Sequence, residues 1–128
     1  MDSERFEHGM QIRREVLGDE YVDRVLTGAD EFSRPFQELV TEFCWGAGWG
    51  EGVLSRRDRS LLNLVMLGAL NRAAEFELHL RGAVRNGCTR DEIRDTLIQL
   101  MIYAGVPAGV EAFRITRRVF AEIDAASA

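Results

Sequence analysis

Hydrophobic residues recur every three to four positions along most of the chain, and no segment alternates like a strand. This period is typical of amphipathic helices. It predicts a first helix over residues 4–17, ended by Gly18, and a short second helix over residues 21–26. Ser33 and Pro35 indicate the start of a third helix, because proline in a first turn lacks only an N–H that would be unpaired there anyway. We expect that helix to carry four apolar side chains toward the core: Phe36, Leu39, Val40 and Phe43.

The middle of the chain contains a glycine-rich segment, residues 46–52, with the sequence GAGWGEG. Glycine loses much backbone entropy in a helix, so this segment is predicted to be a loop. Ser55 is then expected to cap a helix, with Asp58 in its first turn. Residues 61–70, LLNLVMLGAL, are apolar nearly all round that helix. We expect such a helix to be buried on every side, covered by another helix and, in an oligomer, by another subunit.

Capping signals divide the rest of the chain. A helix over residues 74–86 should end at Gly87, which tolerates left-handed backbone. The sequence Thr89-Arg-Asp-Glu92 is a capping box that opens a sixth helix, which should run to Tyr103.

A last helix is predicted to start at Pro107, after a break at Gly105, and to end near Ile123, followed by a frayed tail. Taken together, the pattern predicts an all-α fold, a compact bundle of about six to seven helices in a single domain over residues 1–128.

Composition narrows the function classes. The 128 residues are 46% hydrophobic, enough for a core, and the formal net charge of −5 disfavours nucleic acid as a partner. No apolar stretch is long enough to span a bilayer, and the N-terminal MDSERFEHGM lacks the apolar region of a signal peptide. We therefore expect a cytoplasmic protein with no membrane partner.

Two residue types limit the chemistry. The two cysteines, Cys44 and Cys88, lie too far apart to suggest a disulfide framework or a zinc site, and no CxxC occurs. All 16 basic residues are arginine, which excludes a Schiff-base lysine or a lysine anchor for pyridoxal phosphate. We expect no metal and no cofactor.

Glu75 and His79 are the best candidates for catalysis. Four residues apart on a helix, they share a face, so the carboxylate could accept the imidazole N–H, fix its tautomer and raise its basicity. Such pairs also occur simply as helix-stabilising contacts. Gly82 and Ala83 continue the same face and could leave room above the ring.

Arg59 and two tryptophans are candidates for substrate binding. Arg59 precedes the apolar run and could bind a carboxylate bidentately, or simply form a salt bridge. Trp45 and Trp49 flank the glycine-rich segment, where they could line a pocket or pack in the core.

Five blocks of the chain, in this order and spacing, resemble the γ-carboxymuconolactone decarboxylase family over nearly the full length. They read GMQIRREVLGDEYVDR, FQELVTEFCWG, LSRRDRSLLNLVMLGALNR, EFELHLRGAVRNGCTRDEI and IYAGVPAG. The resemblance implies a compact, alkylhydroperoxidase D-like helical protein that assembles into a ring-like homotrimer or homohexamer. It also implies removal of carbon dioxide from a carboxylated muconolactone without metal or organic cofactor.

Within that resemblance, His79 would be the acid–base group, Glu75 its orienting partner and Arg59 an anion contact. The enzyme would have to stabilise the dienolate that forms as carbon dioxide leaves and supply a proton to carbon. Tyr103 and Arg114 complete the substrate-binding residues that we expect beside the two tryptophans.

The chain departs from the family pattern near the expected site. Cysteine, asparagine and histidine of the family's closing motif are here Ala104, Val110 and Arg114. A Thr-Arg-Pro-Gly segment is replaced by Gly50-Glu51-Gly52-Val53, and a threonine by Asn63. Loss of polar groups should alter the choice of substrate.

Three readings of the function follow. The first is a cofactor-independent decarboxylase acting on a small carboxylated lactone. The second is a divergent paralogue that catalyses decarboxylation, proton transfer or ring rearrangement on a less polar metabolite. The third is a non-catalytic oligomeric binding protein, in which packing would seal the face of His79. A thiol peroxidase is excluded, because that chemistry needs the CxxC that the chain lacks.

Overall fold

The computed structural model describes residues 1–128 and contains seven α-helices and one π-helix, with no strand. The all-α fold expected from the sequence is confirmed. The helices form two compact units, residues 1–56 and residues 57–128. None of the helices combines the length and the apolar run that crossing a membrane requires.

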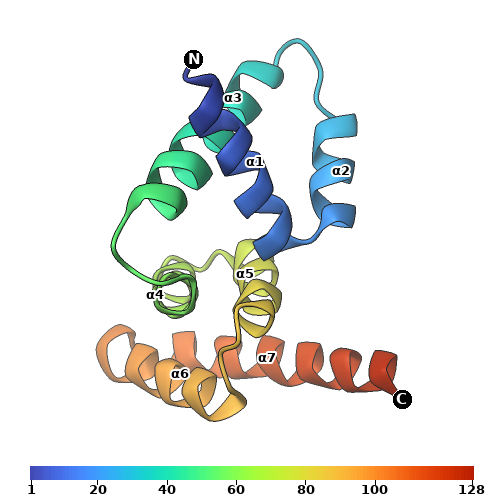
Figure 1. The fold of residues 1–128 in the computed structure, drawn as a ribbon. Coiled ribbons are helices and arrows are strands. Elements are labelled where there is room, and N and C mark those ends of the chain that lie inside the picture. Colours follow the sequence, from blue (N-terminus) through green and yellow to red (C-terminus); the bar gives the residue numbers. More distant parts are fainter. The chain divides into compact units, whose positions relative to one another are not determined.

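The first unit is built on contacts between its first helix and its last (Figure 1). Its elements are α1 (Ser3–Leu17), α2 (Asp19–Thr27), α3 (Arg34–Leu39) and the π-helix η1 (Val40–Trp49), which continues α3 without a break. The Asp2 carboxylate accepts the Arg5 N–H to cap α1, and Gly18, with φ of 91°, ends it as predicted. α3 begins one residue before Pro35, which also confirms that prediction.

Two glycines allow the backbones of α1 and η1 to come close together. A Cβ atom at Gly9 would lie 2.1 Å from the Thr41 carbonyl oxygen, and one at Gly46 would lie 2.4 Å from the Arg5 carbonyl oxygen. No side chain fits at such distances. Glycine is therefore required at both positions for the two helices to cross as they do.

The prediction of a loop over residues 46–52 is wrong, because η1 runs to Trp49 and helical backbone continues through Glu51. The glycines cost backbone entropy in a helix, but their missing side chains permit the close approach of η1 to α1. Close packing on α1 offsets that entropy cost.

A buried polar cluster also fixes η1. Arg13 of α1 is 4% exposed and donates to Thr41 Oγ1 at 3.1 Å and to Gln37 Oε1 at 2.9 Å. The Thr41 hydroxyl in turn donates to the Gln37 carbonyl at 2.8 Å. The face of this segment that carries Phe36, Leu39 and Phe43 is exposed, so the prediction that these side chains point into the core is wrong. Their place in the core is taken by Arg13, Thr41 and Trp45.

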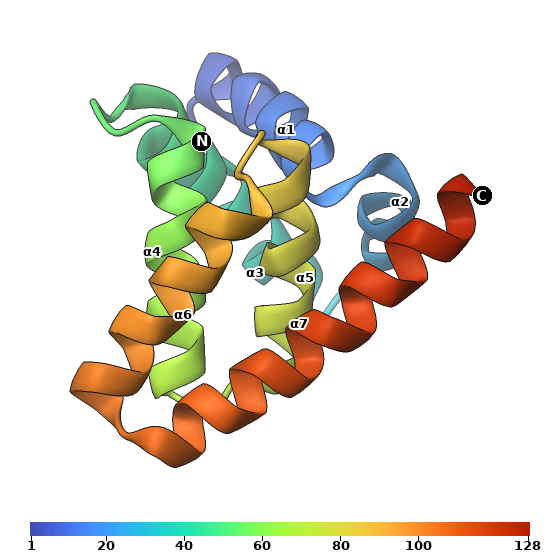
Figure 2. The ribbon, with the colours of Figure 1, turned by 90° about the horizontal axis from the view of Figure 1, so that it is seen from below.

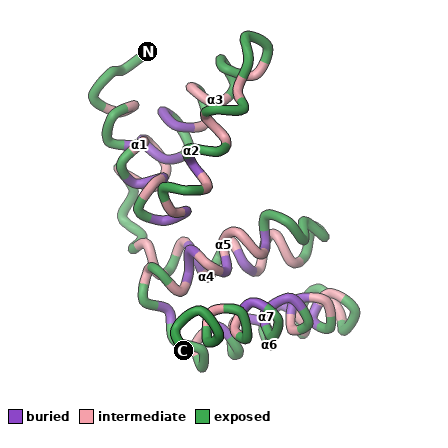
Figure 3. The backbone as a smooth tube through the Cα atoms, turned by 90° about the vertical axis from the view of Figure 1, so that its right-hand side faces the viewer, coloured by how far each residue is buried: buried purple, intermediate pink, exposed green.

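The second unit holds two helix pairs, one above the other, with the buried residues on their facing sides (Figures 2 and 3). Its helices are α4 (Arg56–Ala69), α5 (Ala73–Arg85), α6 (Arg90–Ala104) and α7 (Val106–Ser127). One aliphatic cluster forms its core, including Leu64, Phe76, Leu80, Ile93, Leu97, Leu100, Ile115 and Val119.

The predicted boundaries in this unit are largely confirmed. α4 begins directly after Ser55, and Gly87 and Gly105 follow α5 and α6 with φ of 86° and 105°. The capping box of Thr89 and Glu92 is present in both directions. The last helix continues to Ser127, beyond the predicted end near residue 123.

The prediction that α4 is buried on every side is wrong for the single chain. Leu64 is fully buried, whereas Leu62, Met66 and Leu70 are 47%, 52% and 68% exposed. These three residues follow one another at four-residue intervals and form a stripe along α4, called the α4 stripe below. The core cluster covers only the side of α4 that carries Leu64.

Candidate active site

His79 lies half-buried on α5, between residues that fix the helix in the core. Phe76, Leu80 and Ala83, the residues three before, one after and four after it, are buried in the aliphatic cluster. Gly82, one turn on, is also buried. The backbone that carries the imidazole is therefore rigid, which suits a residue that must hold a substrate atom in place.

The imidazole contacts a polar residue of α4. Asn63 Nδ2 lies 3.3 Å from His79 Nδ1. With the amide as donor, the proton of a neutral ring lies on Nε2. A second contact, from Asn86 Nδ2 to Ser60 Oγ at 2.9 Å, ties the same two helices together further along.

Burial lowers the pKa of His79, and the negative charge of Glu75 opposes this by raising it. The first influence is the larger, so the ring favours its neutral form more than an ordinary histidine does. Glu75 is exposed and acts on the ring through its charge. The sequence prediction had Glu75 raise the basicity of the ring. The direction of that contribution is as expected, but burial outweighs it.

Arg59 lies on α4 one turn before Asn63, so the two side chains share a face of the helix. It is half-buried, and its Nε is a buried donor with no hydrogen-bond partner. An unpaired buried donor costs folding free energy. Arg59 and Asn63 share a face of α4, and the Asn63 amide contacts the imidazole of α5. The role of Arg59 as an anion contact stays a prediction.

The two tryptophans belong to the first unit. Trp45 is 5% exposed and Trp49 is half-buried, and their rings stack with centroids 4.8 Å apart. Stacking of this kind stabilises the end of η1 on its own. Their role in substrate binding stays a prediction.

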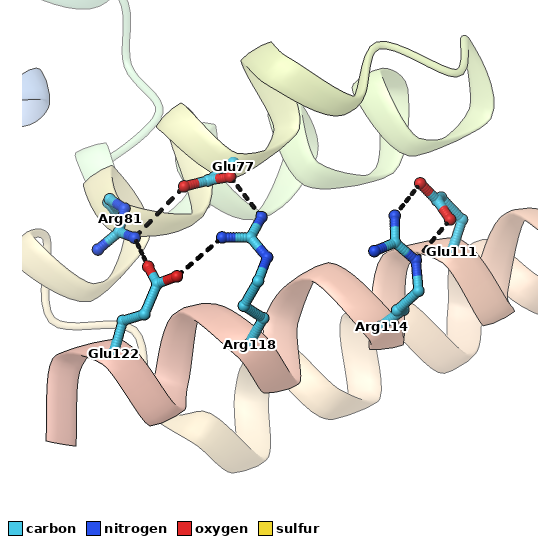
Figure 4. A network of polar contacts seen from close by, with 6 residues as sticks. All are labelled: Glu77, Arg81, Glu111, Arg114, Arg118 and Glu122. Carbon is cyan, nitrogen blue, oxygen red and sulfur yellow. Dashed lines mark hydrogen bonds and ion pairs between the residues drawn. The ribbon is translucent and has the colours of Figure 1, made fainter. Parts of the chain in front are cut away.

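Tyr103 and Arg114 lie on the helical hairpin of α6 and α7. Tyr103 is 82% exposed. Arg114 is exposed and is held by both oxygens of Glu111, at 3.0 and 2.6 Å (Figure 4). This guanidinium is available to a substrate only when that ion pair opens, and its role too stays a prediction.

The positions that depart from the family pattern are also on the surface of the single chain. Ala104 is exposed, and Val110 is 62% exposed. Glu51, from the altered glycine segment, binds the Arg5 guanidinium through two hydrogen bonds of 2.8 and 3.2 Å. The acid that replaces the family's arginine is thus part of an ion pair within the first unit.

Asn63 is the residue that our sequence prediction of the site left out. It was noted only as a departure from the family pattern, yet the structure places its amide against His79. A signal was present, because Asn63 is the one amide in the apolar run of residues 61–70 and follows Arg59 by one helical turn. A polar side chain in such a run usually has a buried polar partner.

Comparison with known proteins identifies the family to which this chain is similar. Residues 34–118 match the model of the carboxymuconolactone decarboxylase family. A 4-carboxymuconolactone decarboxylase of Acinetobacter baylyi is 36% identical over 95% of this chain and 91% of its own length. A nitrosuccinic acid decarboxylase of Metarhizium robertsii is 42% identical over 88% of this chain and 79% of its own.

A third relative, a 4-carboxymuconolactone decarboxylase of Pseudomonas putida, is 44% identical over 35% of this chain and 94% of its own length. The family model spans more than half of the chain, and two named decarboxylases match most of it. The chain therefore belongs to the carboxymuconolactone decarboxylase family and is a carboxy-lyase.

Proposed function

We propose that this protein removes carbon dioxide from a small carboxylated molecule, cyclic or linear, by acid–base chemistry at His79 and without a cofactor. The observation that best supports this is the half-buried imidazole, whose Nδ1 is held by Asn63 and whose pKa is lowered by burial. When an anion arrives, such a ring can take up a proton at Nδ1 as the Asn63 amide turns its oxygen toward that nitrogen, and it can release the Nε2 proton to carbon.

Each group has a definite part in the proposed reaction. The bond between the carboxylate and its neighbouring carbon breaks, carbon dioxide leaves, and the electron pair passes to an acceptor oxygen of the substrate. Arg59 lies near that oxygen and stabilises the charge that develops there. If Arg59 paired with the leaving carboxylate instead, it would stabilise the substrate more than the transition state. Protonated His79 then gives its proton to carbon and is recharged from solvent.

The substrate class follows from what this chemistry needs, which is a carboxylate next to a group that can accept electrons. A carboxylated lactone of the carboxymuconolactone type meets the requirement through its carbonyl oxygen, and one long relative is named for that substrate. The other is named for nitrosuccinic acid, whose nitro oxygens can accept the electrons in the same way. A nitro acid is therefore the second candidate, although it is small and polar, unlike the less polar metabolite that the sequence suggested for a divergent paralogue.

Carbon dioxide release from carboxymuconolactone and from nitrosuccinate, measured in parallel, tests this proposal. His79→Gln should lower kcat at least 100-fold on the true substrate, and Arg59→Gln about as much. His8→Gln, at the other, exposed histidine of the chain, is the matched control and should retain full activity. Equal rates for the wild type and His79→Gln on both substrates would remove His79 from the mechanism.

We also propose that the chain is a homo-oligomer, a trimer or a hexamer. The α4 stripe supports this, because three large apolar side chains in line on one helix favour a partner surface. Met66→Glu should shift the sedimentation of the protein toward smaller species. Gln99→Glu, at an exposed position of α6, adds the same charge and should leave it unchanged. A wild-type protein that sediments as a monomer would contradict this part.

A further inference from the structure

A groove of about 240 Å³ lies between the first half of α6 and the middle of α7. Leu97, Phe113 and Phe120 form its apolar walls. The guanidinium of Arg90 lies over the Phe120 ring, 4.3 Å from its centroid, and closes one side. None of the lining residues belongs to α4 or α5, so the groove is separate from the contact between Asn63 and His79.

Three arginines line this groove, and two of them are already paired. Arg90 binds both oxygens of Asp124, at 3.2 and 2.6 Å. Arg94 binds Asp91 at 3.0 Å. Arg117, from the middle of α7, has neither an ion pair nor a hydrogen bond, although it lines the same groove. The groove thus carries one positive charge without a counter-charge.

A residue with a buried hydroxyl also lines this groove. Thr116, next to Arg117, is 5% exposed and lines the groove, yet its Oγ1 has no hydrogen-bond partner. Threonine in a helix usually donates to the carbonyl four residues earlier, and buried hydroxyls are nearly always paired. The hydroxyl oxygen itself is covered, so it can donate to an acceptor in the groove once the Thr116 side chain turns toward it.

We propose that this groove binds a small aromatic or alicyclic carboxylate at a site distinct from that of His79. The carboxylate accepts hydrogen bonds from the Arg117 guanidinium and the Thr116 hydroxyl. The ring packs between the two phenylalanines, where apolar surface is buried against it. The groove has room for a single ring.

Three features of the groove favour this ligand over a peptide or a purely apolar molecule. The charge that lacks a counter-charge calls for an anion. The unpaired donor beside it calls for an acceptor oxygen of that anion. The aromatic walls call for a flat apolar body on the same molecule. A ring carboxylate combines the negative charge, the acceptor oxygen and the flat apolar body in one small molecule.

Fluorine NMR with 4-fluorobenzoate as the probe tests the proposal on the full-length protein. For so small a ligand we expect a Kd on the order of 1 mM. Arg117→Gln and Thr116→Val should each weaken binding about fivefold or more, and the neutral 4-fluorobenzamide should bind more weakly than the acid. Arg34→Gln, an exposed arginine of α3, is the matched control and should bind like the wild type.

Amide shifts in a nitrogen-15 spectrum locate the probe. We expect the shifted signals to come from residues 90–97 and 113–120. Thr116→Val also has its own readout, since removing an unpaired buried hydroxyl should raise Tm by a few degrees while it weakens binding. Unchanged affinity in both variants, equal binding of the amide, shifts confined to the surroundings of His79, or a groove closed by a second copy of the chain would each overturn the proposal.

Discussion

In residues 1–56 the tightest glycine contacts join backbone to backbone, whereas in residues 57–128 the comparable glycines, Gly68 and Gly109, meet side-chain atoms of Leu100 and Met101. A Cβ atom at Gly9 would lie 2.1 Å from the Thr41 carbonyl oxygen, and one at Gly68 of α4 would lie 2.5 Å from Leu100 Cδ2. A leucine methyl can move aside by a change of rotamer. A carbonyl oxygen inside a helix cannot move without moving the helix.

The buried interiors differ in the same sense. The first unit buries the Arg13 guanidinium, hydrogen-bonded to Thr41 and Gln37, whereas the second buries one aliphatic cluster. Directional contacts and backbone approach fix the first unit in one geometry. A cluster of leucines, isoleucines and valines tolerates rearrangement more readily. The first unit should therefore be the more sensitive to small additions, and the second to losses of volume.

The largest expected effect comes from adding one methyl group to the first unit. Gly9→Ala should destabilise the protein by about 3 kcal/mol or more, because α1 and η1 must separate. Gly68→Ala should cost about 1 kcal/mol, since Leu100 can adapt. Urea unfolding followed by circular dichroism measures both.

Gly48→Ala is the control within η1. Its Cβ would meet only the Phe43 carbonyl oxygen, at an ordinary 3.5 Å, so the change should be neutral or slightly stabilising. Equal costs for Gly9→Ala and Gly68→Ala would show that backbone approach does not distinguish the two units.

Removing volume from the second unit should have the next largest effect. Leu64→Ala leaves a cavity in the aliphatic cluster and should cost about 3 kcal/mol in urea unfolding. Leu62→Ala, two residues away on the α4 stripe, should cost less than about 1 kcal/mol in the monomer. A large cost for Leu62→Ala that depends on protein concentration would instead show that a second chain covers the stripe.

The pH should affect the stability of the two units differently. Arg13 stays protonated at every working pH, whereas His79 is held neutral by burial and its folded pKa lies below the ordinary 6.5. The unfolded chain therefore binds the proton first as the pH falls. The stability from His79 is complete above pH 6.5 and decreases as the pH falls through that value toward the folded pKa.

Unfolding measured at pH 7.5 and at steps down to pH 5 checks this expectation. His79→Gln should show a flatter dependence than the wild type. A wild-type protein that gains stability as the pH falls through this range would contradict the assignment of a buried neutral ring.

The sequence predicted the second unit well for a physical reason. Its helices end at left-handed glycines and begin at a capping box, which are local signals, and its core follows the helical period. The fold of the first unit depends on contacts between positions that are far apart in the sequence. Nothing near Gly46 reveals that Arg5 will lie against it, so the segment was mistaken for a loop.

The candidate site could be predicted in part. His79 was found because a histidine with a carboxylate one turn away is a local pattern. Its hydrogen bond to Asn63 comes from another helix, and its burial depends on the whole fold, so neither the partner nor the direction of the net pKa shift followed from spacing.

The smallest expected effect concerns the charged surface between α5 and α7. Glu77 binds Arg118 at 2.6 Å and Arg81 at 3.3 Å, and Glu122 joins both arginines, which makes a four-membered network (Figure 4). These charges are partly exposed and screened by solvent. Glu77→Gln should therefore cost less than about 1 kcal/mol, and less still at high salt.

The isolated pair of Glu111 and Arg114 on α7 is the matched control. Glu111→Gln removes a single exposed ion pair, so it should leave the midpoint of urea unfolding unchanged at any salt concentration. A loss of stability for Glu77→Gln that salt does not reduce would mean that the network acts by packing α5 on α7. The second unit would then share the directional contacts that distinguish the first.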